Sequence, residues 1–179
     1  AAARLARTDK DLDAEFQHLE QAHYALKGDG QAMDKKVQQV FRKRLSAALP
    51  AVVSQPRQDV PRPIFVVGLP RSGTTMVERM LSAHSAVQGL GEMITVQLWA
   101  RQTETDPSRS ATAGELADFY VQKMPALAAG TLAFVDKMPG NYAHLGVIAQ
   151  AFPNPVILNM QRDPRDIALS MWREYFNAS

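Results

Sequence analysis

The chain has 179 residues, of which 46% are hydrophobic and 21% charged, a composition typical of a soluble globular protein. The formal net charge of +2 is too small to indicate a general nucleic-acid-binding surface, and no apolar run approaches the roughly 18 residues that span a bilayer. Cysteine is absent, which excludes disulfides, thiol catalysis and zinc–thiolate sites and fits the cytoplasmic location that we expect.

Two amphipathic helices are predicted at the N-terminal end. Apolar side chains recur at steps of three and four over residues 11–27, a turn rich in glycine follows, and the same pattern returns over residues 31–49. Two helices around a short turn make a helical hairpin, which we assign to residues 1–53. It is a candidate for the end of a helical repeat region and for a protein contact, although no second copy of the repeat is found. Residues 54–63 hold three prolines and are predicted to be a linker.

From residue 64 onward, short apolar runs alternate with helical patterns. The runs predicted to be strands are 64–67, 134–135 and 156–160. The predicted helices span 73–84, 93–101, 114–129, 141–152 and 164–176. This alternation predicts an α/β fold, a P-loop-like parallel sheet with helices on both faces, in a domain that occupies residues 64–179 and is expected to continue past them. Ligands bind beyond the C-terminal ends of such strands, so the loops 68–75, 136–140 and 161–165 should converge on one crevice.

The first of these loops has the spacing of a phosphate-binding loop. Four residues separate Gly68 from Gly73, and a hydroxyl residue, Thr75, follows one position later. Glycines let successive backbone N–H groups turn inward, and the helix that follows adds its positive N-terminus. Thr74 stands where a nucleotide kinase has lysine, and the cation is Arg71 instead. One arginine with hydroxyls suits a less charged group than a triphosphate. The alternative is a strand-to-helix turn that only uses glycine.

The stretch Pro70-Arg71-Ser72-Gly73-Thr74-Thr75 resembles the phosphosulfate-binding loop of sulfotransferases. The resemblance covers residues 63–176 and is strongest to the tyrosylprotein sulfotransferases and to the bacterial sulfotransferases that carry tetratricopeptide repeats. These enzymes use 3′-phosphoadenosine 5′-phosphosulfate (PAPS) as sulfuryl donor. The resemblance implies that the donor's 5′-phosphosulfate is bound by Arg71, Ser72, Gly73, Thr74 and Thr75.

The resemblance also implies a second anion site after the third predicted strand. Arg162 ends that strand, and Ser170 lies eight residues later on the following helix, a pairing that binds the donor's 3′-phosphate in sulfotransferases. The guanidinium fork of arginine fits phosphate oxygens, and serine adds one hydroxyl donor. The alternative is a set of local ion pairs in which each arginine of Gln161–Asp166 is answered by an aspartate. Asp163 could be mistaken for the metal-binding aspartate of a nucleotide hydrolase, but the loop lacks that class's lysine.

Glu92 is the candidate general base. It lies in Gly89-Leu90-Gly91-Glu92, where the glycines allow the backbone to approach a substrate closely. The matching glutamate of tyrosylprotein sulfotransferases is their catalytic base, which implies the same role here. Those enzymes continue with a second acid and an arginine, whereas Met93 follows in this chain, so a peptide-tyrosine acceptor is left open. The alternative is a solvated glutamate.

Lys137 is the candidate for stabilising the leaving group. It follows the second predicted strand in Asp136-Lys137-Met138-Pro139 and resembles the family lysine that acts on the leaving oxygen. An ammonium on a flexible stem can follow charge as it moves during the transfer. The alternative is an ion pair between Lys137 and its neighbour Asp136.

These features together predict a PAPS-dependent sulfotransferase. Its expected partners are PAPS and an acceptor hydroxyl on a protein tyrosine, a carbohydrate or a small molecule, with no nucleic acid, membrane or metal ion. Two other classes remain open. One is a P-loop nucleotide kinase with a degenerate loop, and the other is a non-catalytic phosphate-binding or scaffold module.

Overall fold

The computed structural model describes residues 2–25, 39, 59–105 and 112–174. The chain divides into two compact units, one formed by Arg44–Arg162 and the other by Ala1–Lys43 with Asp163–Ser179, and each is described by itself. The predicted helix over 31–49 lies outside the described residues apart from residue 39, and so does most of the predicted linker. The boundaries 1–53, 54–63 and 64–179 stay a prediction.

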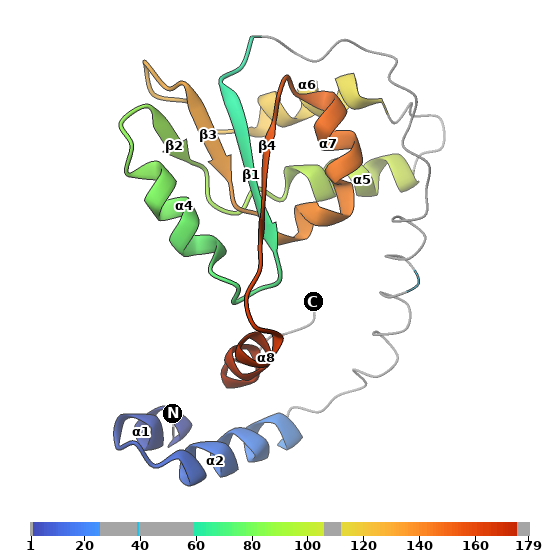
Figure 1. The fold of residues 1–179 in the computed structure, drawn as a ribbon. Coiled ribbons are helices and arrows are strands. Elements are labelled where there is room, and N and C mark those ends of the chain that lie inside the picture. The colour runs from blue at the N-terminus through green and yellow to red at the C-terminus, as the bar shows by residue number, and fades with distance from the viewer. Residues whose placement is uncertain (1, 26–38, 40–58, 106–111, 175–179) are drawn as a thin grey trace. The chain divides into compact units, whose positions relative to one another are not determined.

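The larger unit is built on a four-stranded parallel sheet (Figure 1). Its strands are β1 (Arg62–Gly68), β2 (Val87–Gly89), β3 (Ala133–Asp136) and β4 (Val156–Met160). Their order is β2-β3-β1-β4, and every neighbouring pair is parallel. The predicted α/β class is therefore confirmed. The first, second and third predicted strands correspond to β1, β3 and β4, and the three-residue strand β2 was not predicted.

Helices cover both faces of this sheet. Helix α4 (Thr74–Ser82) lies on one face, and α5 (Thr95–Thr105), α6 (Ala113–Lys123) and α7 (Leu145–Ala151) lie on the other (Figure 1). Side chains alternate between the faces of a strand, and on the α5–α7 side they meet a core of aromatic rings. The rings pack edge-to-face, tilted or stacked with centroids 5.3–6.0 Å apart and are fully buried: Phe65, Tyr120, Phe134 and Phe152.

Prolines explain two places where helices differ from the prediction. The helix predicted over 114–129 ends at Lys123, because Met124 precedes Pro125 and a residue before proline disfavours helical geometry. The helix predicted over 141–152 begins as a 3-10 helix, η1 (Pro139–His144), and continues as α7, which ends at Ala151 because Phe152 precedes Pro153 and is extended. The segment after β3 therefore winds as a 3-10 helix before the α-helix α7 begins.

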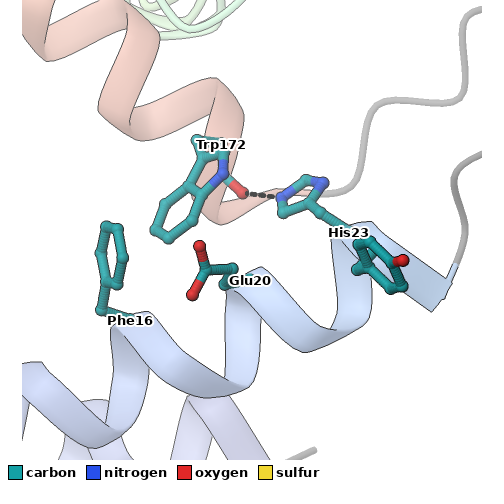
Figure 2. A pocket seen from close by; sticks show the side chains of 5 residues that line it. Phe16, Glu20, His23 and Trp172 are labelled. Atoms are coloured by element: carbon teal, nitrogen blue, oxygen red, sulfur yellow. Dashed lines mark hydrogen bonds between the residues drawn. The ribbon is translucent and has the colours of Figure 1, made fainter.

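The described part of the smaller unit contains α1 (Ala2–Thr8), α2 (Leu12–Ala25) and α8 (Pro164–Arg173). Glu15 on α2 is 3% exposed in its side chain and accepts hydrogen bonds from Arg7 Nε (2.6 Å) and Arg173 Nη2 (3.2 Å). The ring of Trp172 on α8 lies 4.6 Å from that of Phe16 and stacks on His23 (Figure 2). His23 Nε2 donates to the Trp172 carbonyl at 2.7 Å. An ion cluster and an aromatic stack thus join α8 to α2.

This ion cluster predicts an acid-sensitive contact. Burial raises the pKa of Glu15, but the hydrogen bonds and charges of Arg7 and Arg173 outweigh it and hold the pKa below its ordinary value. The stabilisation is therefore complete above the unfolded-state pKa, about 4.3, and is lost as the pH falls through the lower folded-state value. We expect Glu15→Gln to loosen α8 at pH 7 and to match the parent chain at pH 2. Trp172 fluorescence during urea unfolding, in a Trp99→Phe background, measures this.

The matched control is Glu20→Gln, which removes an exposed carboxylate from the same helix and should leave the pH dependence unchanged. A difference between Glu15→Gln and the parent chain that persists unchanged at pH 2 would contradict the ion-cluster account.

Candidate functional site

The phosphate-type loop joins β1 to α4 and takes the backbone conformation that its glycines allow. Gly68 has φ +144° and Gly73, the N-cap of α4, has φ +100°. Arg71 also lies in the left-handed region, with φ 70°, and it is exposed. The Ser72 N–H donates to the Leu69 carbonyl at 3.2 Å, which closes the turn. Residues 68–75 therefore form a compact strand-to-helix turn at the C-terminal edge of the sheet.

Two donors of this loop are placed to receive an anion. Ser72 is 5% exposed, and its Oγ has no hydrogen-bond partner within the described residues. A buried hydroxyl in that condition is costly unless a ligand or water satisfies it. No side chain caps the first turn of α4 at Gly73, so its backbone N–H groups are available as well. Of the two threonines, Thr74 is buried and Thr75 is exposed. The loop thus fits an anionic group such as a phosphosulfate.

Gly68 is expected to tolerate no side chain. A Cβ built on it would lie 2.7 Å from the carbonyl oxygen of Met160 on β4 and 3.1 Å from Ser72 Oγ, in addition to the positive φ. We expect Gly68→Ala to cost about 3 kcal/mol or more of unfolding free energy, because the backbone strain adds to a backbone clash. Urea unfolding measures the loss.

Gly130→Ala separates the two causes. Gly130 has φ +85° but nothing within 4 Å of a built Cβ, so its substitution carries the strain alone, about 1 kcal/mol. Equal losses at the two glycines would mean that the contact between β1 and β4 is not as close as described.

The candidate base and the candidate lysine lie in direct contact. Glu92 lies in the turn after β2 and Lys137 directly follows β3, and the two strands are parallel neighbours. Lys137 Nζ donates to Glu92 Oε1 at 2.5 Å. The lysine side chain is 9% exposed, whereas that of the glutamate is 58% exposed. The pair therefore has a covered cationic end and an open carboxylate end that a second molecule can reach.

Asp136 does not form the ion pair with Lys137 that was the alternative reading. Its fully buried carboxylate turns inward and accepts from the Tyr120 hydroxyl (2.8 Å) and from Asn141 Nδ2 (3.1 Å). The N–H of Met138 donates to it at 3.0 Å. Burial raises the pKa of Asp136 to about 6, and these hydrogen bonds limit the rise. The sequence analysis did not predict this network. An aspartate at the end of a buried strand was the signal that could have indicated it.

Arg162 reaches the phosphate-type loop. It follows β4, which pairs with β1 up to Gly68 and Met160, and its Nη1 donates to the Arg71 carbonyl at 3.3 Å. Both guanidinium groups are exposed. Ser170 lies half-buried on α8 in the other unit, so the structure describes Arg162 and Ser170 separately.

The aspartate next to Arg162 has a different partner. Asp163 caps α8, accepts from the Arg165 backbone N–H at 2.8 Å and pairs with the Arg165 side chain at 2.8 Å. The hydrogen bond from the Arg165 side chain lowers the pKa of Asp163 below its ordinary value. The local ion pair expected as an alternative thus exists for Arg165.

A pocket of about 670 Å³ lies in the smaller unit and contains none of the predicted site residues. It is an open hollow beside the aromatic stack of α2 and α8 (Figure 2). Its lining residues are Phe16, Glu20, His23, Tyr24 and Trp172. No group of three or more histidine, aspartate or glutamate side chains within the described residues is placed to hold a metal ion. None of the described helices is long and apolar enough to cross a membrane.

The described part of the chain is thus a parallel α/β sheet of the P-loop-like class, with a phosphate-type loop after its first strand and a Glu–Lys contact at the same edge. Residues 63–179 match the sulfotransferase family, and the chain belongs to that family. It is also similar to an uncharacterized protein of Aquifex aeolicus (strain VF5), with 28% identity over 188 aligned residues. That alignment covers 94% of this chain and 25% of the relative, so the chain spans about a quarter of the relative's length.

Proposed function

We propose that the protein transfers a sulfuryl group from PAPS to an acceptor hydroxyl. Family membership supports sulfuryl transfer in general. The single observation that carries the proposal further is the contact between Glu92 and Lys137, at the sheet edge where the phosphate-type loop also lies. A carboxylate that can take a proton and an ammonium that can meet developing negative charge are the two groups that this chemistry requires.

The donor's phosphosulfate end is assigned to the loop after β1. The N–H groups at the start of α4 and the hydroxyls of Ser72, Thr74 and Thr75 supply hydrogen bonds, and Arg71 supplies the positive charge. The orphaned Ser72 Oγ supports this assignment, because an anion would satisfy it. The 3′-phosphate is assigned to Arg162 and Ser170 from their eight-residue spacing in the sequence, which resembles the sulfotransferase pairing.

Glu92 and Lys137 then act on different oxygens of the transfer, Glu92 on the acceptor hydroxyl and Lys137 on the departing phosphate oxygen. As the acceptor oxygen forms its bond to sulfur, the bond from sulfur to the phosphate oxygen breaks, and its electron pair leaves with adenosine 3′,5′-bisphosphate. Glu92 takes the acceptor's proton. Lys137 has three N–H donors, so it can keep its bond to Glu92 and donate another to the departing oxygen. The atoms balance without a further reactant.

The acceptor class is proposed only as a hydroxyl, on a protein tyrosine, a carbohydrate or a small molecule. Glu92 is exposed, so the carboxylate is open to acceptors of different sizes. The N-terminal helices are proposed as a site of protein contact.

The assay incubates the protein with PAPS, EDTA and separate acceptors: a phenol, a sugar and a tyrosine peptide. We expect adenosine 3′,5′-bisphosphate and a sulfated product in equal amounts with at least one acceptor. Failure to consume PAPS, together with magnesium-dependent turnover of ATP, would contradict the proposal and favour a nucleotide kinase.

A further inference from the structure

We propose that Asp136 is a positioning residue that fixes the backbone at Glu92 relative to the backbone at Lys137. The inference rests on the proposed function of that pair. Asp136 does not reach either catalytic side chain. Its carboxylate instead binds the backbone N–H of the residue after each of them, Met93 and Met138.

Backbone hydrogen bonds also join the two segments on the side of β2, where the Leu90 N–H donates to the Val135 carbonyl at 2.8 Å. The Lys137 N–H donates to the Gly91 carbonyl at 2.9 Å, and the Gly91 N–H donates to Glu78 Oε1 on α4 at 2.7 Å. These bonds hold the near side of the Glu92 turn. On the other side of Glu92, the Met93 N–H donates to the Asp136 carboxylate. Because the Met138 N–H donates to the same carboxylate, Asp136 ties the Glu92 turn to the start of the segment after β3. The turn is thereby fixed at both ends, which limits the orientations open to Glu92.

The carboxylate is itself oriented from two directions. Tyr120 on α6 donates to Oδ2, and so does Asn141 Nδ2 on η1. Flipping the amide of Asn141 would break a second hydrogen bond, because its Oδ1 accepts from Gln97 Nε2 on α5 at 3.0 Å. A chain of hydrogen bonds therefore runs from the helical layer to the backbone of the catalytic turn. Such a fully satisfied buried network specifies one geometry.

Only a carboxylate satisfies this environment. All four partners of Asp136 are donors, and a carboxylate accepts at both oxygens. The pKa of about 6 leaves the group mostly ionised at pH 7. An asparagine of the same shape would turn an NH₂ group toward N–H donors on one side. Asp136→Asn should therefore break either the bond from the Met138 N–H or the bond from Asn141 Nδ2 that orients the side chain, while it preserves the volume of the core.

The test compares Asp136→Asn with the parent chain in three measurements. Hydrogen exchange of the backbone amides of residues 91–93 and 137–138 should become at least tenfold faster, while exchange in β1 should not change. Turnover, measured as adenosine 3′,5′-bisphosphate formed from PAPS with 4-nitrophenol as probe acceptor, should fall about tenfold or more. The dissociation constant of adenosine 3′,5′-bisphosphate should stay within about twofold, because the loop after β1 does not use Asp136.

The matched control is Ile148→Val, which trims a fully buried side chain of α7 and leaves every hydrogen bond of Asp136 in place. It should lower the unfolding free energy by about 1 kcal/mol and leave turnover within about twofold, measured well below the melting temperature. Equal loss of turnover in the two variants would overturn the proposal in favour of a general stability effect. Parental turnover and exchange in Asp136→Asn would overturn it as well.

If Asp136→Asn does not fold, Asn141→Ala decides, because it removes the group that orients the carboxylate. An unchanged exchange rate at residues 91–93 in that variant overturns the proposal. Failure of the parent chain to bind adenosine 3′,5′-bisphosphate would contradict the proposed function instead. The exchange measurement needs no ligand and tests the hold on the turn independently.

Discussion

Replacing Glu92 by glutamine is expected to lower the turnover number about 10²–10⁴-fold, the usual contribution of a general base. Glutamine keeps the shape of the side chain and an oxygen that can accept from Lys137, but it cannot take the proton of the acceptor hydroxyl. The dissociation constant of adenosine 3′,5′-bisphosphate should stay within about threefold, because Glu92 lies after β2 and not in the loop after β1. Initial rates with saturating PAPS, together with a binding titration, separate the two effects.

Glu115→Gln is the matched control for this experiment. Glu115 is an exposed residue of the capping box that begins α6, and glutamine serves equally well at that position. Its substitution should change neither turnover nor binding. A Glu92→Gln chain with more than a third of the parental turnover would contradict the assignment of Glu92 as base. If the protein is a binding module without catalytic activity, neither chain should show turnover and both should bind the nucleotide equally.

Replacing Lys137 by methionine is expected to lower turnover about 10²–10³-fold, the range seen when one group that stabilises transition-state charge is removed. Methionine matches the length of the lysine stem, so the largely buried position stays filled. Glu92 loses its partner, but at 58% exposure water can solvate the carboxylate. The loss should therefore appear in the transfer step, which single-turnover kinetics with PAPS and 4-nitrophenol resolves.

Lys123→Met provides the comparison for Lys137→Met. Lys123 is an exposed residue that ends α6, with its Nζ 5.9 Å from the centre of the Phe119 ring. Its removal should leave the transfer rate within about twofold. If the two lysine variants behave alike, the stabilisation of the leaving group must come from another residue.

The phosphate-type loop and the sheet around it could be predicted because their signals are local. The spacing from Gly68 to Thr75, the apolar run before it and the amphipathic pattern after it are all read within about twenty residues. Because the strands are parallel, their C-terminal ends meet at one edge of the sheet, and the loops after β1, β3 and β4 therefore lie at that edge. The sequence identified Glu92 as the candidate base but did not predict its position next to β3. The strand before it, Val87–Gly89, has only three residues and forms through its pairing with β3.

The buried network and the contacts of α8 could not be predicted because they join residues distant in sequence. Asp136 meets Tyr120 sixteen residues earlier through tertiary packing, and no periodicity signals that encounter. The bond between His23 and Trp172 spans 149 residues. Sequence patterns indicate which face of an element is apolar, whereas the partner of that face depends on the whole fold.

The most direct test of the account is a calorimetric titration of the protein with adenosine 3′,5′-bisphosphate, in parallel with adenosine 5′-phosphate and with ATP plus magnesium. The account predicts that the bisphosphate binds at least tenfold more tightly than either competitor, a difference of about 1.4 kcal/mol, because the 3′-phosphate distinguishes it. Equal affinity for all three nucleotides, or tighter binding of ATP with magnesium, would contradict it.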